Sequence, residues 1–364
     1  MVRQGTAPLR RGWTTGACAA AAARAAFAAL LTGDFPDPVA IRLPRGETPS
    51  FPLALAEHCG GSARAGIVKD AGDDPDVTHG ALIVAELAWA AAGSGIIFRA
   101  GEGVGTVTRP GLALAVGEPA INPAPRAMIG DTLLDLAEAN GAPSPDLTVT
   151  IAIPGGERLA EKTMNRRLGI VGGLSVLGTT GIVVPYSCSS WIHAIHRGID
   201  VARAAGFGHI AAATGNTSER AVQRLYGLSE AALIDMGDFV GGTLKYLRRH
   251  PVPRLTLAGG FAKIAKLAQG HLDLHSSRSR IDPAALAGVL AGLGADRATV
   301  AAAAEADSAG AILDLAGERR AALAATVARQ AREVALATLS GKTAVEVAIV
   351  DRAGDFVARI GAEA

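Results

Sequence analysis

The feature that most constrains the fold is a change of pattern about halfway along the chain. From about residue 39 to 153, short β-type runs are broken by Gly, Pro and Asp clusters. From about residue 190, helical and strand-like segments alternate, as expected of a parallel sheet with helical crossovers. At 364 residues the chain is also too long for one ordinary core. We therefore predict two domains: residues 1–165, an N-terminal α+β domain with a mixed sheet, and residues 166–364, a C-terminal α/β domain with a largely parallel sheet.

Hydrophobic periodicity and turn residues predict the individual elements within this frame. An alanine-rich helix opens the chain, and a hairpin on the sheet edge is expected at 344–360. The alanine-rich stretch 298–311 is interpreted as a surface helix. Helices are predicted at about 17–31, 127–140, 190–205, 218–227, 239–249, 262–269, 283–293 and 318–339, and strands within 38–44, 50–58, 80–90, 94–101, 147–153, 209–214, 232–236 and 254–260.

Composition excludes several classes of function. The chain has 35 Lys and Arg against 34 Asp and Glu, which leaves no basic field for nucleic acid. Its hydrophobicity comes from alanine, and no long apolar stretch lacks a charge or glycine, so neither a membrane span nor a secretion signal is expected. The three cysteines form no C-x-x-C pair, so we expect a reducing cytoplasm and no metal site. Whether the active unit is a monomer or a homodimer stays open.

The first candidate site is Thr14-Thr15-Gly16, at the start of the first helix. Free N–H groups and the helix dipole make such a position an anion seat. An ordinary cap by one threonine is the equally weighted alternative.

The segment 69–80, KDAGDDPDVTHG, carries four carboxylates within seven positions, with Lys69 and His79 near its ends. Carboxylates this close together repel one another unless cations, hydrogen-bond donors or a ligand compensate their charge. A carboxylate held near others can have a raised pKa and act as a general base, as can His79. The spacing does not fit a calcium loop. We favour a functional role over a surface turn.

Glycine turns supply the remaining candidates in the first half. The segment 101–105, GEGVG, is followed by a β-type run instead of a helix, so it is not a dinucleotide loop, although a ligand can still approach its backbone. Arg126, beyond the turn 117–123, either pairs with an anion or lies in solvent. The segment 173–187 combines glycines, hydroxyls and apolar residues, which suits a chain that lines a cleft.

In the second half, the segments 214–219, 236–241 and 259–263 each turn from a strand into a helix, where open α/β sheets bind ligands. We expect the three turns to gather on one edge. A capping box at Asn216 or Thr217 is the alternative for the first. Lys263 and Lys266 share a helix face and precede His275, which suits anion binding or a solvated face.

Taken in order, eight segments resemble the successive signatures of the cobalt-precorrin-5B C1-methyltransferase family. They are TTGACAAAAARAA, KDAGDDPDVTHG, GEGVGTVTRPGL, GEPAINPAPRAMI, GLSVLGTTGIVVPYS, ATGNTSE, MGDFVG and KIAKLAQGHLDLHS, spanning residues 9 to about 280. The chain departs from the usual pattern at Gly260, often His, at Ala262, often Gly, and at Asp273-Leu274, often Asn-Thr.

The resemblance implies S-adenosylmethionine-dependent methylation of ring carbon C1 of a cobalt-containing tetrapyrrole, cobalt-precorrin-5B, to give cobalt-precorrin-6A in cobalamin biosynthesis. Methyl transfer requires alignment and exclusion of water and no covalent nucleophile. The ring's carboxylates need Arg, Lys and helix N-termini around an apolar slot. We assign catalysis to Asp73, Asp74 and His79, donor binding to Thr179, Thr180, Gly181, Thr214, Gly215, Asn216, Gly259 and Gly260, and substrate binding to Thr14, Thr15, Gly16, Lys69, Glu102, Arg126, Lys263, Lys266 and His275.

Two other classes of function remain as alternatives. One is a corrinoid carrier that binds the macrocycle without chemistry. The other is a nicotinamide-dependent reductase, against which the absence of G-x-G-x-x-G between a strand and a helix argues.

Overall fold

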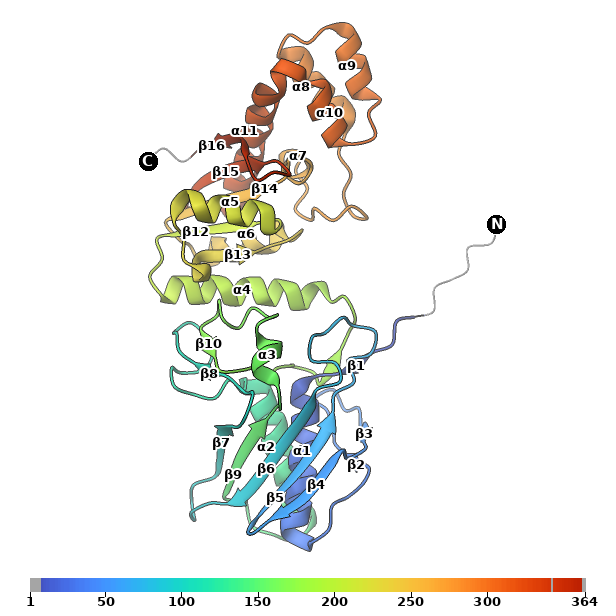
Figure 1. Ribbon diagram of the computed structural model, residues 1–364, viewed down its shortest axis with the longest axis vertical. Coiled ribbons are helices and arrows are strands. Elements are labelled where there is room, and N and C mark those ends of the chain that lie inside the picture. The colour runs from blue at the N-terminus through green and yellow to red at the C-terminus, as the bar shows by residue number, and fades with distance from the viewer. Residues whose placement is uncertain (1–7, 342, 362–364) are drawn as a thin grey trace, which may run out of the picture. The chain divides into compact units, whose positions relative to one another are not determined.

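The computed structural model describes residues 8–341 and 343–361, which form two compact units (Figure 1). Unit 1 comprises residues 1–188 and unit 2 residues 189–364. The division falls later than the boundary at 165/166 expected from the sequence. Segment 166–188 belongs to unit 1 because it pairs with earlier strands: β10 (Ile170–Val171) with β8 (Thr106–Val107), and β11 (Ile182–Val183) with β1 (Gly12–Trp13).

Unit 1 is built on a five-stranded sheet in the order β4-β5-β6-β9-β7. Neighbouring strands are antiparallel except β7 and β9, which are parallel, so the predicted mixed sheet is confirmed. The sequence analysis missed β5, whose alanines and glycine have low strand propensity. The strands are β4 (Leu55–Cys59), β5 (Ser62–Val68), β6 (Leu82–Trp89), β7 (Ile96–Ala100) and β9 (Leu147–Ala152).

Two helices, α1 (Thr15–Thr32) and α2 (Pro123–Ala139), cover one face of this sheet (Figure 1). The alanines between Ala17 and Ala26 are fully buried, which lets the α1 backbone approach β5 and β6 closely. Phe27 and the inward-facing residues of the strands complete one core cluster. By length and composition α1 is long and apolar enough to cross a membrane, but 78% of it is buried inside the unit, as in a core helix.

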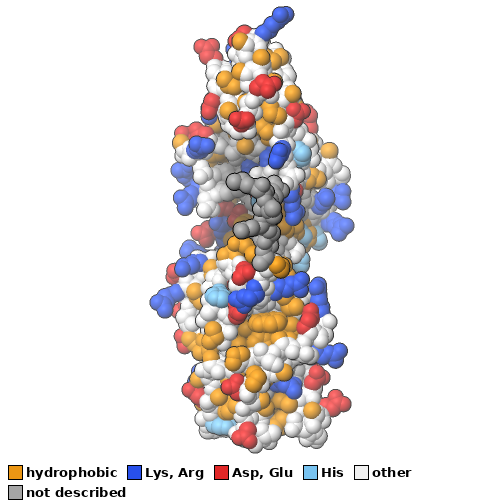
Figure 2. Space-filling view, turned by 90° about the vertical axis from the view of Figure 1, so that its right-hand side faces the viewer, with side chains coloured by type: hydrophobic (Ala, Val, Ile, Leu, Met, Phe, Trp, Pro, Cys, Tyr) orange, Lys and Arg blue, Asp and Glu red, His pale blue; other side chains and the backbone are white. Residues whose placement is uncertain are grey.

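Unit 1 also contains further short elements outside its main sheet. Strands β2 (Val39–Ala40) and β3 (Ser50–Phe51) form a two-stranded ladder, and α3 (Gly156–Ala160) follows β9. Figure 2 shows Lys and Arg interspersed with Asp and Glu over the face in view, with apolar side chains between them.

Unit 2 contains a second five-stranded sheet in the order β13-β12-β14-β15-β16. The first four strands are parallel and β16 is antiparallel on the edge, which confirms the predicted largely parallel sheet and its terminal hairpin. The strands are β12 (His209–Ala213), β13 (Leu233–Asp235), β14 (Arg254–Gly259), β15 (Ala344–Val350) and β16 (Phe356–Ile360).

Helices cover both faces of the unit 2 sheet. Helix α5 (Asn216–Tyr226) packs on the face that carries Ala211, Ala213 and Leu233. The opposite face, with Ile210, Ala212 and Ile234, packs against the larger cluster. That cluster is formed by helices α4 (Cys188–Ala204), α6 (Val240–Arg249), α7 (Phe261–Ala268), α8 (Pro283–Gly292), α10 (Ala309–Leu315) and α11 (Arg320–Leu339), with α9 (Arg297–Ala304) beside α8.

One predicted helix is divided in the structure. The stretch 298–311 contains all of α9 except its first residue and the start of α10, with a break at residues 305–308. The break arises because Ser308 has an extended backbone and its Oγ accepts a hydrogen bond from Ala311 N at 3.2 Å, capping α10. The single surface helix expected from alanine content is therefore wrong.

Candidate functional site

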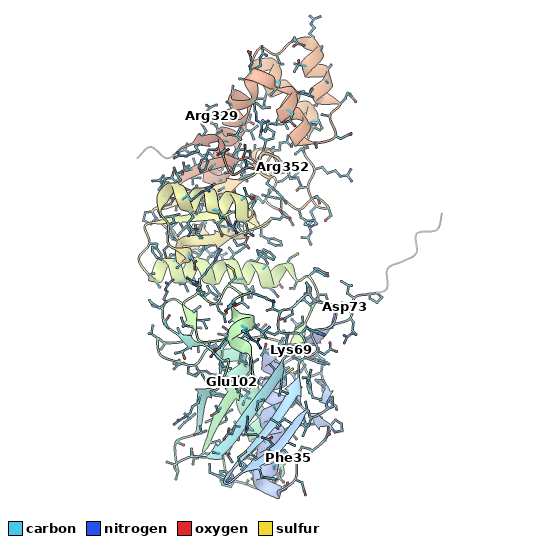
Figure 3. All side chains as sticks on the ribbon, in the orientation of Figure 1. Phe35, Lys69, Asp73, Glu102, Arg329 and Arg352 are labelled. Atoms are coloured by element: carbon cyan, nitrogen blue, oxygen red, sulfur yellow. The ribbon has the colours of Figure 1, made fainter. Side chains whose placement is uncertain are left out.

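Three of the sequence motifs meet in unit 1, although they are far apart along the chain. Gly12 and Trp13 pair with Val183 and Ile182, and Trp13 N also donates to Asp70 O at 2.7 Å. These contacts join residues 10–16, 69–80 and 177–186, which we call the motif cluster. Lys69 and Asp73 lie at the end of unit 1 where α1 begins, whereas Phe35 lies at the opposite end (Figure 3).

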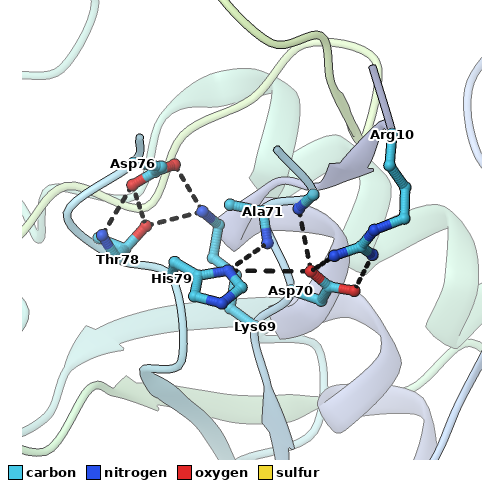
Figure 4. Close-up of polar contacts among 8 residues, drawn as sticks. Arg10, Lys69, Asp70, Ala71, Asp76, Thr78 and His79 are labelled. Carbon is cyan, nitrogen blue, oxygen red and sulfur yellow. Dashed lines mark hydrogen bonds and ion pairs between the residues drawn. The ribbon is translucent and has the colours of Figure 1, made fainter. Parts of the chain in front are cut away.

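The aspartates of the motif cluster bind backbone and cationic groups of neighbouring segments. Asp73 accepts from Arg10 N at 2.6 Å, and Asp74 accepts from Tyr186 N at 2.8 Å. Asp70 is hydrogen-bonded and ion-paired to the Arg10 guanidinium (Figure 4). That hydrogen bond, with the Gly72 N–H, lowers the pKa of Asp70 to about 2. The carboxylate crowding is thus compensated within the protein.

Lys69 is buried, with 1% of its side chain exposed, and is held by this same segment. Its Nζ donates to Asp76 Oδ2 at 2.6 Å and to Thr78 Oγ1 at 2.8 Å (Figure 4). Burial alone raises the pKa of Asp76, but Lys69 and Thr78 lower it below its ordinary value on balance. The raised carboxyl pKa expected from crowding is therefore wrong for Asp70 and Asp76. This geometry makes Lys69 a structural cation and argues against its contact with a substrate carboxylate.

His79 is exposed and uses one ring nitrogen to hold the loop. Ala71 N donates to His79 Nδ1 at 3.1 Å, and Asp70 Oδ1 lies 3.8 Å from the same nitrogen (Figure 4). Because Nδ1 accepts a hydrogen bond, the neutral ring carries its hydrogen on Nε2. In this arrangement His79 can donate from Nε2. It acts as a base only if it gives up the Ala71 contact.

The start of α1 is capped by the protein itself. Thr14 Oγ1 accepts from Ala17 N at 3.2 Å, and Gly16 N donates to Leu177 O at 3.0 Å. Thr14 and Thr15 are buried, at 6% and 3% exposure. The ordinary-cap alternative for residues 14–16 is therefore the one observed, and these amides offer no open anion seat.

The segment Thr179-Thr180-Gly181 lies beside that cap. Gly181 O accepts from Thr14 N at 2.9 Å, and Thr180 Oγ1 accepts from Ile182 N at 3.3 Å. Gly181 has a φ of +82° and faces the Leu43 side chain closely. Thr179 is exposed. The structure thus places this predicted donor-binding segment in unit 1, among the other motif-cluster residues.

Glu102 and Arg126 have structural partners. In the turn 101–105, a Cβ on Gly103 would lie 2.0 Å from Ile153 O, so the glycine permits close approach of the protein's own backbone. Glu102 Oε1 accepts from Gly155 N at 3.4 Å. Arg126 donates to Ile121 O at 2.8 Å and is ion-paired with Glu118 Oε2 at 2.8 Å, so of the two predicted roles it pairs with an anion, which here is a carboxylate of its own chain.

The motif cluster, with the adjoining Leu9, carries exposed apolar side chains that we call the apolar rim, and the sequence analysis named none of them individually as a site residue. Tyr186 is 68% exposed and has a φ of +54°, a strained value for a residue other than glycine. Arg11 lies two residues after Leu9 and directly precedes β1, and its exposed side chain makes no hydrogen bond or ion pair with the residues described. The rim comprises Leu9, Val77, Leu177, Val184 and Tyr186.

The unit 2 sheet has a topological switch point between β12 and β14. After β12 the chain passes through α5 to β13 on one side, and then through α6 to β14 on the other side of β12. In open α/β sheets, ligands bind at the carboxyl ends of the two strands where the order reverses. Those ends carry Thr214-Gly215-Asn216 and Gly259-Gly260.

These two turns touch each other across the switch point. Thr214 N donates to Ala258 O at 2.9 Å, and a Cβ on Gly259 would lie 2.8 Å from Thr214 Oγ1. Helices α5 and α7 begin after Gly215 and Gly260, neither of which supplies a side-chain cap. The capping box considered for residues 216–219 has Asn216 or Thr217 as its cap, whereas the cap position of α5 is Gly215.

Lys263, Lys266 and His275 gather near this edge, where they hold a loop. Lys263 is ion-paired with Asp238, and Lys266 Nζ donates to Leu274 O at 2.9 Å. Burial and the neighbouring Lys263 lower the pKa of Lys266. His275 Nδ1 lies 2.7 Å from Ser277 Oγ within the same exposed loop. The predicted turns of unit 2 thus do gather on one edge, and both lysines have partners there.

A cavity of about 400 Å³ lies away from every predicted site residue. It opens beside the end of α1, next to Phe35, at the end of unit 1 opposite the motif cluster (Figure 3). Among residues 8–341 and 343–361, no group of three or more His, Cys, Asp or Glu side chains is placed to hold a metal ion.

Comparison with known proteins identifies the family. Residues 2–185 match the family model described as CbiD, and residues 273–361 match the model of the CbiD C-terminal domain. The chain is 60% identical to the cobalt-precorrin-5B C(1)-methyltransferase of Paramagnetospirillum magneticum, over 96% of this chain and 97% of that protein. It is 58% identical to the protein of the same name from Methylorubrum extorquens, over 97% and 98%. A 1.9 Å crystal structure of a cobalamin biosynthesis protein (cbiD) from Archaeoglobus fulgidus is 29% identical, covers 74% of this chain and 83% of that one, and has a TM-score of 0.40. The chain therefore belongs to the CbiD family.

Proposed function

We propose that this protein transfers a methyl group from S-adenosylmethionine to ring carbon C1 of cobalt-precorrin-5B, giving cobalt-precorrin-6A in cobalamin biosynthesis. The observation that carries the proposal is the 60% identity, over nearly the full length of both chains, to a protein named for this reaction. The sulfonium–carbon bond breaks as the bond to C1 forms, and S-adenosylhomocysteine leaves. Cobalt is part of the substrate.

We assign the donor to the switch point of unit 2. The turns Thr214-Gly215-Asn216 and Gly259-Gly260 end adjacent parallel strands and begin helices whose cap positions are glycines. Helix N-termini bind carboxylates through their backbone amides and dipole, and the donor's methionine part carries a carboxylate. Lys263, ion-paired with Asp238, lies at the same edge.

We assign the macrocycle to the motif cluster and its apolar rim. A tetrapyrrole presents apolar ring faces and peripheral carboxylates, the rim offers exposed apolar side chains, and Arg11 offers an exposed guanidinium two residues after Leu9. Thr179 is exposed within the same cluster. Lys69 and the cap at Thr14 support this surface by holding its segments in place.

For the acidic segment we propose that Asp73, Asp74 and His79 manage the proton balance at the macrocycle. Both carboxylates accept a backbone hydrogen bond yet keep further acceptor capacity, and His79 Nε2 is free of the Ala71 contact. Replacing all three residues together in a correctly folded variant should abolish turnover. Unchanged turnover would contradict the assignment.

The decisive assay uses the purified chain with labelled S-adenosylmethionine and cobalt-precorrin-5B. Methyl transfer to the ring, found at C1 by NMR, is the expected result. A corrinoid carrier would bind the ring and transfer no label, and a reductase would require a nicotinamide cofactor. Either outcome would overturn the proposal. We further propose a cytoplasmic location, with no nucleic-acid partner and no membrane span, since α1 is a buried core helix.

A further inference from the structure

We propose that Asp235 and Trp191 bind the adenosine half of the donor. Asp235 accepts hydrogen bonds from the ribose hydroxyls, and the Trp191 ring packs against the adenine. The inference rests on the proposed function and extends it to the strand beside the switch point. Neither residue belongs to the motifs from which the donor site was predicted. Their positions in unit 2 carry the argument.

Asp235 ends the strand next to the donor turn. Strands β12 and β13 are parallel, and Ala213 and Asp235 are partners in register, so both strands reach the same edge together. Asp235 follows Gly215 by 20 residues (235 − 215). In nucleotide-binding α/β sheets, an acidic residue about 20 residues after the glycine turn binds the ribose hydroxyls. Here too a glycine turn follows one strand and an acidic residue ends the next strand, although the turn lacks the dinucleotide glycine pattern.

The alternation of side chains along β13 shows on which face of the sheet the Asp235 side chain lies. Side chains alternate along a strand, and Leu233 lies in the cluster beneath α5 whereas Ile234 lies in the cluster on the other face. Asp235 therefore points to the α5 side, where residues 214–216 rise into that helix. An ionised carboxylate has about four acceptor sites on its two oxygens, so Asp235 can accept from the ribose 2′ and 3′ hydroxyls alongside the contact that it already makes in the protein.

Trp191 places an aromatic ring beside Asp235. It lies in the first turns of α4, and its indole Nε1 donates to Asp235 O at 3.1 Å. The Phe239 ring centroid is 6.4 Å away, and a Cβ on Gly237 would lie 3.4 Å from the indole. Trp191 is nevertheless 46% exposed. A rigid aromatic surface held open at a ligand-binding edge is suited to a purine base.

The test separates ribose recognition from a purely structural role. The probes are S-adenosylhomocysteine and its 2′-deoxy analogue, titrated calorimetrically into the full chain. Wild-type protein should bind the deoxy analogue roughly tenfold more weakly, as expected for one lost hydrogen bond to a charged acceptor. Asp235→Ala should bind both probes equally and more weakly. Trp191→Leu should weaken both by the same factor, and Trp191→Phe should restore most of the affinity.

A matched control and a folding check keep the test decisive. Glu333→Ala removes an exposed carboxylate from α11 and should leave both affinities unchanged. Thermal melts identify any variant that has lost its fold, and Asp235→Asn then replaces Asp235→Ala. Asp235 variants that keep the wild-type ratio of affinities would overturn the ribose assignment while leaving the proposed function intact. Failure of the wild-type protein to bind S-adenosylhomocysteine would instead contradict the proposed function itself.

Discussion

Replacing Lys69 with Met is the sharpest test of the motif cluster as a structural unit. Methionine keeps the buried aliphatic stem and removes only the ammonium group, so little apolar contact is lost. The change leaves Asp76 and the Thr78 hydroxyl without their buried donor. We expect the 69–80 loop to loosen and unit 1 to lose stability.

The magnitude follows from the burial of the two partners. Removing one member of a buried ion pair costs about 3–5 kcal/mol because the other charge stays uncompensated. The Asp76 side chain is 25% exposed against 1% for Lys69, so water relieves part of the cost and the lower end of about 3 kcal/mol applies. At about 1.36 kcal/mol per factor of ten, unit 1 should open roughly 150-fold more often.

Hydrogen exchange measured by mass spectrometry resolves this effect within the chain. Peptides covering β5 and β6 should exchange roughly 150-fold faster in Lys69→Met, and peptides from β12 and β14 should be unchanged. Lys162→Met, at an exposed lysine of the same unit, is the control and should change stability by less than about 0.5 kcal/mol. A Lys69→Met protein that exchanges like the control would refute the buried-pair reasoning.

Further predictions concern the approach of residue 12 to residue 71 and the response to acid. Gly12→Ala would place a Cβ 2.0 Å from the Ala71 carbonyl carbon, so we expect a loss of roughly 3 kcal/mol or more in urea unfolding. Gly130→Ala meets only Ile96 Cδ1 at 3.9 Å and should be neutral or stabilising by about 0.5–1 kcal/mol; equal midpoints for both variants would contradict this. The pKa of Asp70 is lowered to about 2, so its pairing with Arg10 stabilises the fold above about pH 4 and is lost as the pH falls towards 2. The stability difference between wild type and Arg10→Gln should therefore shrink below pH 4, and a difference that stays constant in urea midpoints down to pH 2 would show that the pair is absent.

The sequence predicted well those elements whose patterns are local. The parallel strands of unit 2 and their crossover helices follow from alternating apolar runs and glycine turns, so the gathering of three turns on one edge could be foreseen. Strand β5 could not, because Ala63, Ala65 and Gly66 have low strand propensity and owe their place to close packing against α1. The break at Ser308 was hidden by the helix-forming alanines around it.

The candidate site was harder to predict because its contacts are long-range. The sequence showed that Asp74 belongs to a crowded acidic segment, but its partner, Tyr186 N, lies 112 residues away. In the same way, nothing local to Lys69 or Arg126 shows that their donors are already satisfied. Spacing in the sequence can indicate which residue types a site needs. Whether a charged side chain is available to a ligand or already paired within the protein depends on tertiary contacts.

A crystal structure of the protein bound to S-adenosylhomocysteine tests the central claim most directly. The account predicts the ligand over the carboxyl ends of β12 and β14, with its amino-acid part against the turns 214–216 and 259–260 and its ribose beside Asp235. S-adenosylhomocysteine bound instead within the motif cluster of unit 1, with the β12–β14 edge left empty, would contradict it.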